Sequence, residues 1–130
     1  LGYLIAKERL FQIDFQSRVA SGRLSEIFGA DRIKTDQFLR RTGMMLGAER
    51  TWNEIQRHSP EVKAVLEAFT SGANAYISSL SPKDYPFEFR LLDYAPEAWS
   101  PVKSILVNQL MACDLTFQGQ LDDVVMEEMR

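Results

Sequence analysis

Apolar side chains recur every three or four positions along most of the chain, which is the spacing of one face of an α-helix. Residues 3–19 follow this spacing and predict a first helix, which Gly22 is expected to end. A short helix from Leu24 to Phe28 should follow and stop at Gly29. The apolar positions of the first helix are Tyr3, Ala6, Leu10, Phe11, Ile13 and Phe15.

A longer helix is predicted next, starting near Asp31 or Thr35, either of which could cap it, and running to about Arg57. Gly43 and Gly47 lie inside it, and a glycine costs about 1 kcal/mol relative to alanine in a helix interior. The two glycines therefore mark close packing or a kink. The stripe along this helix consists of Phe38, Arg41, Met45, Ala48, Trp52 and Ile55.

Two Ser-Pro pairs predict further helix starts, because a hydroxyl cap followed by proline at the first helical position favours initiation. The pair at Ser59 should begin a helix that runs to Leu80. The pair at Ser100 should begin a helix over Val102–Leu115.

The rest of the C-terminal half is less regular. Residues 81–98 hold three prolines and are expected to form a loop with a short helix over Glu88–Asp93. Gly119 is expected to break the chain before a last helix over Leu121–Met129. No segment alternates in polarity as a strand does, so we predict an all-α chain with one helical domain over residues 1–130.

Charge and composition remove several classes of function. The net charge is −3, whereas nucleic-acid-binding domains show a basic excess, so no nucleic-acid partner is expected. No run of about 18 apolar residues predicts a transmembrane segment. Cys113 is the one cysteine, which excludes an internal disulfide, and its apolar neighbours predict a buried thiol. The chain opens on Leu1 without a basic-then-apolar leader, which indicates a processed or excised piece.

Residues with catalytic or metal-binding chemistry are sparse. His58 is the one histidine, and its place at a helix junction predicts exposure and no paired nucleophile. The chain also lacks the histidines and cysteines of a metal-dependent hydrolase and any glycine-rich phosphate loop. A cluster of acids forms either a solvated helix face or a calcium contact. Its members are Asp122, Asp123, Glu127 and Glu128.

Charged side chains also stand among the apolar positions of two helices. Around the first two predicted helices, their spacings of three and four residues predict ion pairs that lock these helices together, with phosphate or carboxylate recognition as the alternative. Asp114 closes an apolar helix, and an acid there has either a structural hydrogen bond or a pocket role. The first group consists of Arg9, Asp14, Arg18, Arg23 and Glu26.

Four stretches together resemble the penicillin acylase family. The first two run from Gly2 to Asp14 (GYLIAKERLFQID) and from Arg18 to Gly29 (RVASGRLSEIFG). The third is GANAYI at residues 72–77, and the fourth falls within residues 86–101 (PFEFRLLDYAPEAWSP). The resemblance spans nearly the whole chain and places it inside the α subunit of such an enzyme.

This resemblance implies a fold and a mechanism. Family members are N-terminal-nucleophile amidohydrolases of αββα architecture, made as one precursor that cleaves itself into an α and a β subunit. The nucleophile is the first residue of the β subunit, a serine whose own α-amine acts as the base, and the oxyanion hole lies on the same subunit. The present chain would therefore hold no catalytic residue and would need the β subunit as its partner.

The resemblance also indicates substrate-binding residues. In the family, the helix after the W-x-P motif shapes the acyl pocket, which corresponds here to Met111, Asp114 and Leu115. Classical penicillin G acylases have an Arg-Phe pair where this chain has Asp-Leu, so a phenylacetyl preference does not carry over. Many members bind calcium through a glutamate a few residues later. Gln120 stands near that position, so a weakened calcium site and no other cofactor are expected.

The function implied for the holoenzyme is cleavage of an acyl side chain from a small-molecule amide, such as a β-lactam antibiotic or an acyl-homoserine lactone. A periplasmic or secreted location is implied with it. The alternative is a non-catalytic helical interaction module that has kept the family sequence. The two hypotheses differ in whether the parent gene encodes a downstream serine that becomes an N-terminus.

Overall fold

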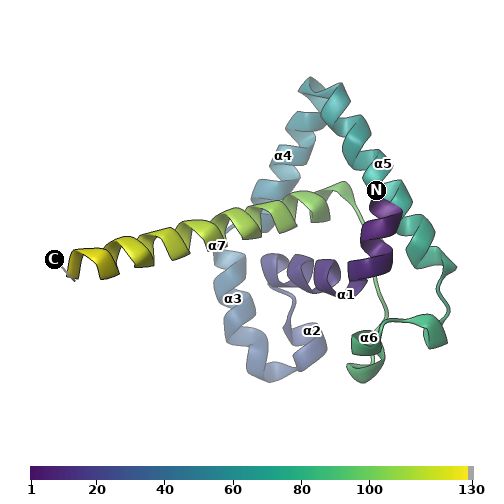
Figure 1. Cartoon of the computed structure of the whole chain (residues 1–130), viewed down its shortest axis with the longest axis horizontal. Coiled ribbons are helices and arrows are strands. Elements are labelled where there is room, and N and C mark those ends of the chain that lie inside the picture. The colour runs from purple at the N-terminus through teal and green to yellow at the C-terminus, as the bar shows by residue number, and fades with distance from the viewer. Residues whose placement is uncertain (129–130) are drawn as a thin grey trace.

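A computed structural model describes residues 1–128, with side-chain positions for residues 1–116. Every regular element in this part of the chain is helical, which confirms the all-α prediction (Figure 1). The α-helices are α1 (Gly2–Ser21), α2 (Ser25–Phe28), α3 (Ile33–Arg41), α4 (Met44–His58), α5 (Pro60–Ser79), α6 (Phe87–Leu91) and α7 (Pro101–Glu128). Two short 3₁₀ helices are η1 (Ala30–Arg32) and η2 (Pro82–Asp84).

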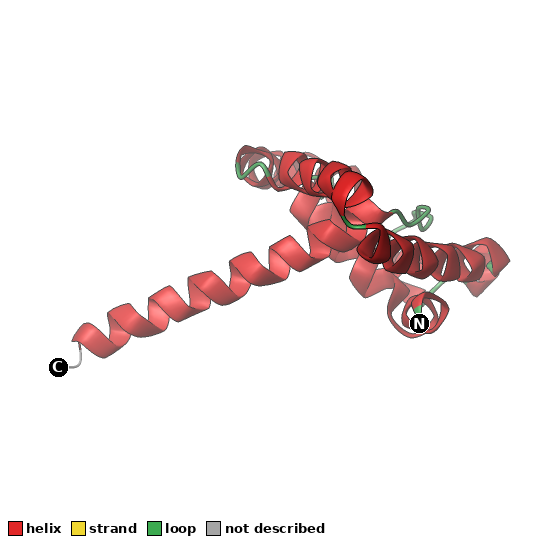
Figure 2. Cartoon of the chain, turned by 90° about the horizontal axis from the view of Figure 1, so that it is seen from above, coloured by secondary structure: helices red, strands yellow, loops and turns green. Residues whose placement is uncertain are grey.

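Helix α1 lies at the centre of the packed helices and contacts α3, α4, α5 and α7 (Figure 1). Helices α4 and α5 meet at a sharp turn and diverge from it, with the start of α7 packed against both. In two perpendicular views, α7 then runs out beyond the other helices (Figures 1 and 2). The packed body therefore consists of α1 to α6 together with the first part of α7.

Helix α1 confirms the predicted first helix and its end at Gly22. Gly22 has a φ of 65°, the left-handed conformation typical of a helix C-terminus, and its N–H donates to the Val19 carbonyl at 3.0 Å. A kink that the sequence did not indicate lies at Arg9, where φ is −140° and ψ is 28°. The first half of α1 therefore runs beside α5 and the second half turns under α7 (Figure 1).

The long helix predicted to end near Arg57 is not continuous, because the chain forms two helices, α3 and α4, that separate at Gly43. The kink expected at the glycines is confirmed at Gly43. Gly43 has a φ of 74°, which glycine adopts at little cost because it lacks a Cβ. Neither Asp31 nor Thr35 caps α3, which begins at Ile33 without a side-chain cap. The break lets α3 pack on α1 while α4 packs on α7.

Asp36 of α3 is a buried carboxylate that caps a neighbouring helix. Its two oxygens accept hydrogen bonds from the backbone N–H groups of Leu24 and Ser25 at 2.8 and 2.7 Å, at the start of α2. Burial alone would raise the pKa of Asp36, but the hydrogen bonds from Ser25 and Leu24 outweigh it and lower this pKa. Asp36 therefore remains ionised and ties α2 to α3.

Both Ser-Pro helix starts are confirmed, since α5 begins at Pro60 and α7 at Pro101. The hydroxyl of Ser100 accepts a hydrogen bond from the N–H of Lys103 at 3.3 Å, as a cap should. Ser59 makes no side-chain cap hydrogen bond. At the start of α5, Pro60 and the packing of the helix therefore suffice without a capping hydroxyl.

Two details of the C-terminal half differ from expectation. The short helix expected over Glu88–Asp93 is α6, which begins one residue earlier and ends at Leu91. Helix α7 continues through Gly119, so the predicted break and the separate helix over Leu121–Met129 are wrong. One glycine destabilises a helix by about 1 kcal/mol, which is less than the stabilisation from the many backbone hydrogen bonds of a long helix.

Helices α1 and α5 approach closely where two glycines face each other. A Cβ atom on Gly72 would lie 2.9 Å from the backbone nitrogen of Tyr3, and a Cβ on Gly2 would overlap the carbonyl of Phe69. Any side chain at these positions would force the backbones apart. Glycine at both positions therefore allows the contact on which α1 and α5 depend.

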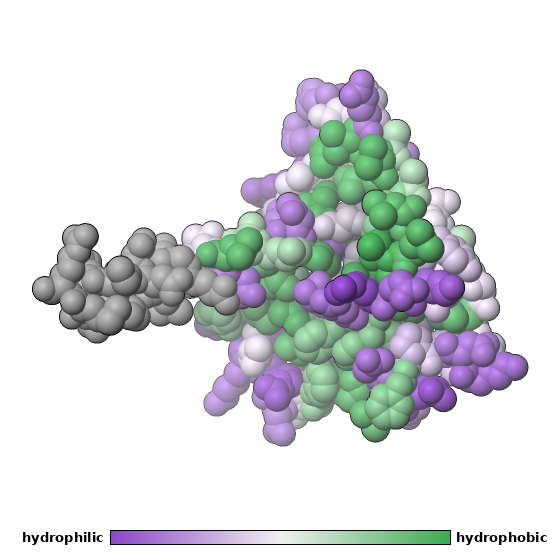
Figure 3. Space-filling view, in the orientation of Figure 1, coloured by the Kyte–Doolittle hydropathy of each residue, from purple (hydrophilic) through white to green (hydrophobic). Residues whose placement is uncertain are grey.

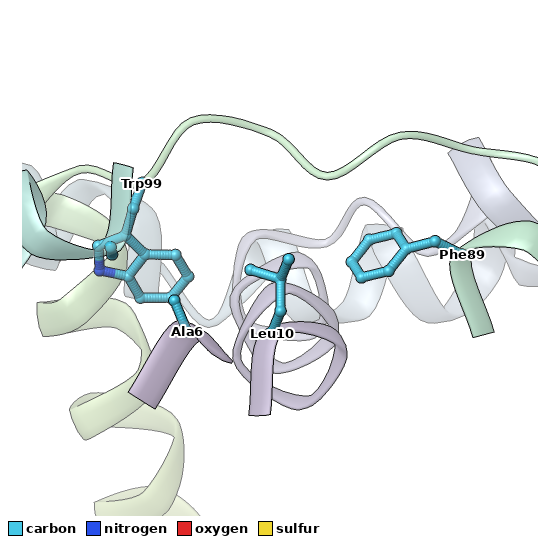
Figure 4. Packing of buried hydrophobic residues seen from close by; sticks show 5 residues of the cluster. Ala6, Leu10, Phe89 and Trp99 are labelled. Atoms are coloured by element: carbon cyan, nitrogen blue, oxygen red, sulfur yellow. The ribbon is translucent and has the colours of Figure 1, made fainter. Parts of the chain in front are cut away.

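The first apolar core lies where α1, α5, α6 and the segment before α7 meet. Figure 4 shows Trp99 over Ala6, and Phe89 directed toward Leu10. Side chains from three other parts of the chain thus converge on α1. The Trp99 indole N–H is satisfied by the Ser104 hydroxyl at 2.9 Å. The buried members are Ala6, Leu10, Ala73, Phe89 and Trp99.

A second apolar core joins α1, α4 and α7. Its buried members are Ala20, Ala48, Ile105 and Leu106. The two alanines carry small side chains, which lets the three helices approach closely at this point. This core fixes the first part of α7 in the body.

Candidate functional site

A cluster of charged side chains joins α1, α2 and the segment before α7. At its centre Arg18, whose side chain is 5% exposed, donates through Nε to Oδ2 of Asp14 at 2.9 Å. Its Nη1 donates to Glu26 at 3.0 Å, and its Nη2 lies 3.1 Å from Glu97. Tyr94 donates its hydroxyl to Asp14 at 3.3 Å, and its ring lies 5.0 Å from the guanidinium carbon of Arg18.

A second arginine and a lysine complete this ion-pair cluster. Arg23 donates to both Glu26 oxygens at 2.8 and 2.7 Å and to both Glu97 oxygens at 3.1 and 2.6 Å. Lys103 donates to Glu97 at 3.0 Å and to the carbonyl of Ala98 at 2.8 Å. Each cation thus faces at least one carboxylate, which favours the structural interpretation over recognition of an external anion.

The ion pairs keep these groups charged. The hydrogen bond from Arg23 is the main cause that lowers the pKa of Glu97 to about 2, with Lys103 adding to it against the effect of burial. The hydrogen bond from Arg23 also lowers the pKa of Glu26, and Glu97 raises that of Arg23. Burial, and then the charge of Asp14, raise the pKa of the Tyr94 hydroxyl, so Tyr94 remains a donor.

The sequence predicted part of this cluster correctly. Asp14, Arg18, Arg23 and Glu26 form the expected network between α1 and α2. Arg9 does not belong to it, because it lies at the kink, is exposed and donates to Gln12 at 3.0 Å. The remaining members, Tyr94, Glu97 and Lys103, come from distant sequence and had no local signal.

The stability of the chain should fall in acid partly through Glu97. Its folded-state pKa of about 2 lies below its ordinary 4.5, so its ion pairs contribute fully above pH 4.5 and are lost as the pH falls toward 2. We expect Glu97→Gln to lower stability at neutral pH and to flatten its decline over this range. Denaturant midpoints measured across the range test this. Parallel curves for the wild type and the variant would contradict it.

The substrate-binding residues expected from the family resemblance lie together on α7, where it leaves the packed body. Met111 and Leu115 are one turn apart and are 54% and 68% exposed, and Asp114 beside them is also exposed. Figure 3 shows apolar surface on α7 where its described side chains end. Cys113 is half-buried, so the prediction of a buried thiol is wrong. This part of α7 has too few neighbours to cover it.

The other candidate groups are placed as follows. His58 is exposed, as expected, and its Nε2 lies 3.4 Å from Glu54. Within the described residues, no three histidine, cysteine or acidic side chains are grouped to hold a metal ion. No helix among the same residues is long and apolar enough to cross a membrane. Gln120 and the acids at 122, 123, 127 and 128 lie outside the described side chains.

A groove of about 870 Å³ follows the kink of α1. Its charged lining carries both signs and is exposed, so the groove offers no single charge for a ligand and no nucleophile beside a base. The sequence analysis did not predict this groove, whose lining includes Arg9 at the unpredicted kink. The charged residues that line it are Lys7, Glu8, Arg9, Asp84 and Glu88.

The family model for penicillin amidase matches residues 1–130, which is the whole chain. The chain belongs to the penicillin amidase family. This confirms the resemblance inferred from the four sequence stretches. Those stretches cover most of α1, all of α2, part of α5, all of α6 and the segment that leads to α7.

Curated relatives within the family cover two substrate classes by name. The penicillin acylase 2 proenzyme of Pseudomonas sp. (strain SE83) is 37% identical over 107 residues, which are 82% of this chain and 13% of that protein. The acyl-homoserine lactone acylase QuiP of Pseudomonas syringae pv. tomato is 31% identical over 130 residues, with 98% and 15% covered. The penicillin G acylase of Escherichia coli is 29% identical over 103 residues, with 77% and 12% covered. The chain spans 12–15% of the length of these relatives.

Three of the stretches that carry the family resemblance are joined to one another by ion pairs and hydrogen bonds. The second stretch supplies Arg23 and the fourth supplies Glu97, which pair in the charged cluster. Asn74 of the third stretch donates to the Trp99 carbonyl at 3.0 Å and accepts from the Trp99 N–H at 2.7 Å. These bonds fix the irregular segment before α7, so they set where α7 starts.

Proposed function

We propose that this chain is one helical domain, residues 1–130, of the α subunit of a penicillin-acylase-like amidohydrolase of αββα architecture. The observation that carries the proposal is the family match over the whole chain. Relatives named as penicillin acylases and acyl-homoserine lactone acylases support an acyl amide as the substrate class. The holoenzyme would cleave the acyl side chain from a β-lactam or homoserine-lactone amide and act in the periplasm or outside the cell.

The chemistry would reside on the β subunit. There an N-terminal serine would attack the amide carbonyl, with its own α-amine as the base and an oxyanion hole holding the developing charge. Among the described residues, His58 is exposed and faces Glu54, which supports the view that this chain alone hydrolyses no amide. The contribution of this chain would be to shape the acyl pocket.

The pocket would draw on Met111, Asp114 and Leu115. Met111 and Leu115 form an exposed apolar pair one turn apart, which is the kind of surface an acyl chain contacts. Asp114 places a negative charge beside that pair and would disfavour acyl groups that end in a carboxylate, by like-charge repulsion. The residues thus combine an apolar contact with a charge that selects against acidic chains.

Expression of the full-length protein tests this proposal. Mass spectrometry should detect self-cleavage that leaves serine at the new N-terminus, and the purified product should release acyl groups from a panel of penicillins and acyl-homoserine lactones. Replacement of that serine by alanine is the control and should abolish both. A full-length protein that stays uncleaved and releases no acyl group would instead support a non-catalytic interaction module.

We expect Leu115→Phe to shift the holoenzyme toward shorter acyl chains. A larger side chain removes pocket volume, and one methylene of such volume changes kcat/KM about 10- to 200-fold. The measurement is kcat/KM for a series of acyl amides that differ only in chain length. Leu91→Phe is a matched control, because Leu91 on α6 is 67% exposed, close to the 68% of Leu115. Identical acyl-chain-length rankings for the wild type and both variants would show that Leu115 does not line the pocket.

A further inference from the structure

The direction in which α7 leaves the packed body depends on a small number of contacts. Ile105 and Leu106 are buried in the second apolar core, and Leu110 packs partly against it. From Met111 onward, the described side chains are mostly exposed. Among the described side chains of α7, those that pack into the body precede Met111, apart from the half-buried Cys113.

One contact near the end of this packed part is unusual. The amide of Gln109 lies over Gly47 of α4, so that a Cβ built on Gly47 would be 3.4 Å from Nε2 and 3.7 Å from Oε1 of Gln109. The amide lies against the bare backbone of Gly47, where a Cβ would still be at ordinary van der Waals distance. Oε1 of Gln109 is also buried without a hydrogen-bond partner, an arrangement that stability alone does not favour.

The contact lies just before the outer part of α7, which begins at Met111, so a small tilt of the helix at this contact displaces the residues that follow. With a rise of 1.5 Å per residue, Leu115 lies about 9 Å along the helix axis from Gln109, so a tilt of about 10° moves Leu115 by roughly 1.5 Å. A misplacement of about 1 Å in a substrate-positioning group can cost about 100-fold in rate. A small change in the contact between α4 and Gln109 would thus displace Leu115 enough to affect the rate.

We propose that the contact between Gly47 and Gln109 sets the direction of the outer part of α7, which makes both of them positioning residues for acyl-chain selectivity. Neither residue touches the substrate in this proposal, and both act through the helix that carries Met111, Asp114 and Leu115. The proposal rests on the proposed function. It adds a determinant on α4, a helix to which the family resemblance assigned no role in substrate choice.

The test uses the full-length mature protein with the variants Gly47→Ala and Gly47→Leu. Alanine places a Cβ at an ordinary contact distance from Gln109, whereas leucine needs the space that the amide occupies. We expect Gly47→Leu to change the ratio of kcat/KM for long and short acyl amides about 10-fold or more, and Gly47→Ala to change it much less. The double variant Gly47→Leu with Gln109→Ala should bring the ratio back toward the wild type, because it vacates the space.

Controls separate positioning from loss of folding and from failure of the proposed function. Arg50→Leu, an exposed residue on α4, should leave the ratio unchanged. If the wild type is active and Gly47→Leu keeps its ratio, the positioning proposal is overturned. If the wild type releases no acyl group, the proposed function fails. In that case, crystal structures of the wild type and of Gly47→Leu test the positioning proposal. Leu115 should differ in position by about 1.5 Å between them, relative to α1 and α5. An unchanged position of Leu115 overturns the proposal.

Discussion

Replacing Arg18 with methionine is expected to destabilise the chain by about 3–5 kcal/mol, because it leaves the buried carboxylate of Asp14 without its cation. Both side chains are almost fully buried, with exposed fractions of 5% and 3%, so water cannot replace the lost partner. The change also removes the contacts of Arg18 with Glu26 and Glu97. Urea denaturation followed by far-ultraviolet circular dichroism measures the loss.

Two controls test the physical reason for the loss at Arg18. The double variant Asp14→Leu with Arg18→Met should recover much of the stability, since an apolar pair can replace a buried ion pair at little cost. Arg57→Met removes an exposed partner 3.8 Å from Glu54 and should cost at most about 1 kcal/mol. Equal losses for Arg18→Met and Arg57→Met would show that burial does not set the strength of these pairs.

Replacing Phe89 with alanine is expected to destabilise the chain by about 3–5 kcal/mol, the usual range for a buried phenylalanine. Phe89 is fully buried and is the one buried residue of α6. Its ring centroid lies 5.6 Å from that of Phe11 in an edge-to-face arrangement and 4.8 Å from that of Tyr94. The substitution would leave a cavity between α1 and the segment that leads to α7.

The matched control for Phe89 is Phe87 on the same short helix. Phe87 is 64% exposed, so Phe87→Ala removes the same atoms with little change in buried area and should stay within about 0.5 kcal/mol of the wild type. Denaturant titration of both variants gives the comparison. Similar losses would indicate that α6 is stabilised by its own helical propensity and not by packing of one ring.

The local signals in the sequence predicted the helices well. Apolar spacing and the two Ser-Pro pairs located α1, α5 and the start of α7, because helix initiation depends on a few adjacent residues. The charges of α1 and α2 paired as expected for the same reason, since residues three and four apart on a helix are neighbours. The kink at Arg9 had no such signal, because no glycine or proline marks it.

The charged cluster depends on contacts between residues that are far apart in the sequence. Arg23 and Glu26 are three residues apart on the chain, but Glu97 reaches Arg23 only because Asn74 fixes the backbone of Trp99 and the segment before α7 lies against α1. A pairing across this distance depends on the packing of whole helices. Its strength depends on burial, which is also a tertiary property.

The family, the all-α class of the described residues and the main helix starts were determined by the sequence alone, since each depends on residues that are near neighbours along the chain. Only the tertiary structure decided which glycines interrupt a helix. Gly43 ended a helix while Gly119 did not, although both carry the same intrinsic penalty. The chain turns at Gly43 because α3 then packs on α1 and α4 on α7. Burial in those contacts, together with the penalty of about 1 kcal/mol that glycine would carry inside a helix, outweighs the helical hydrogen bonds that are lost at the turn.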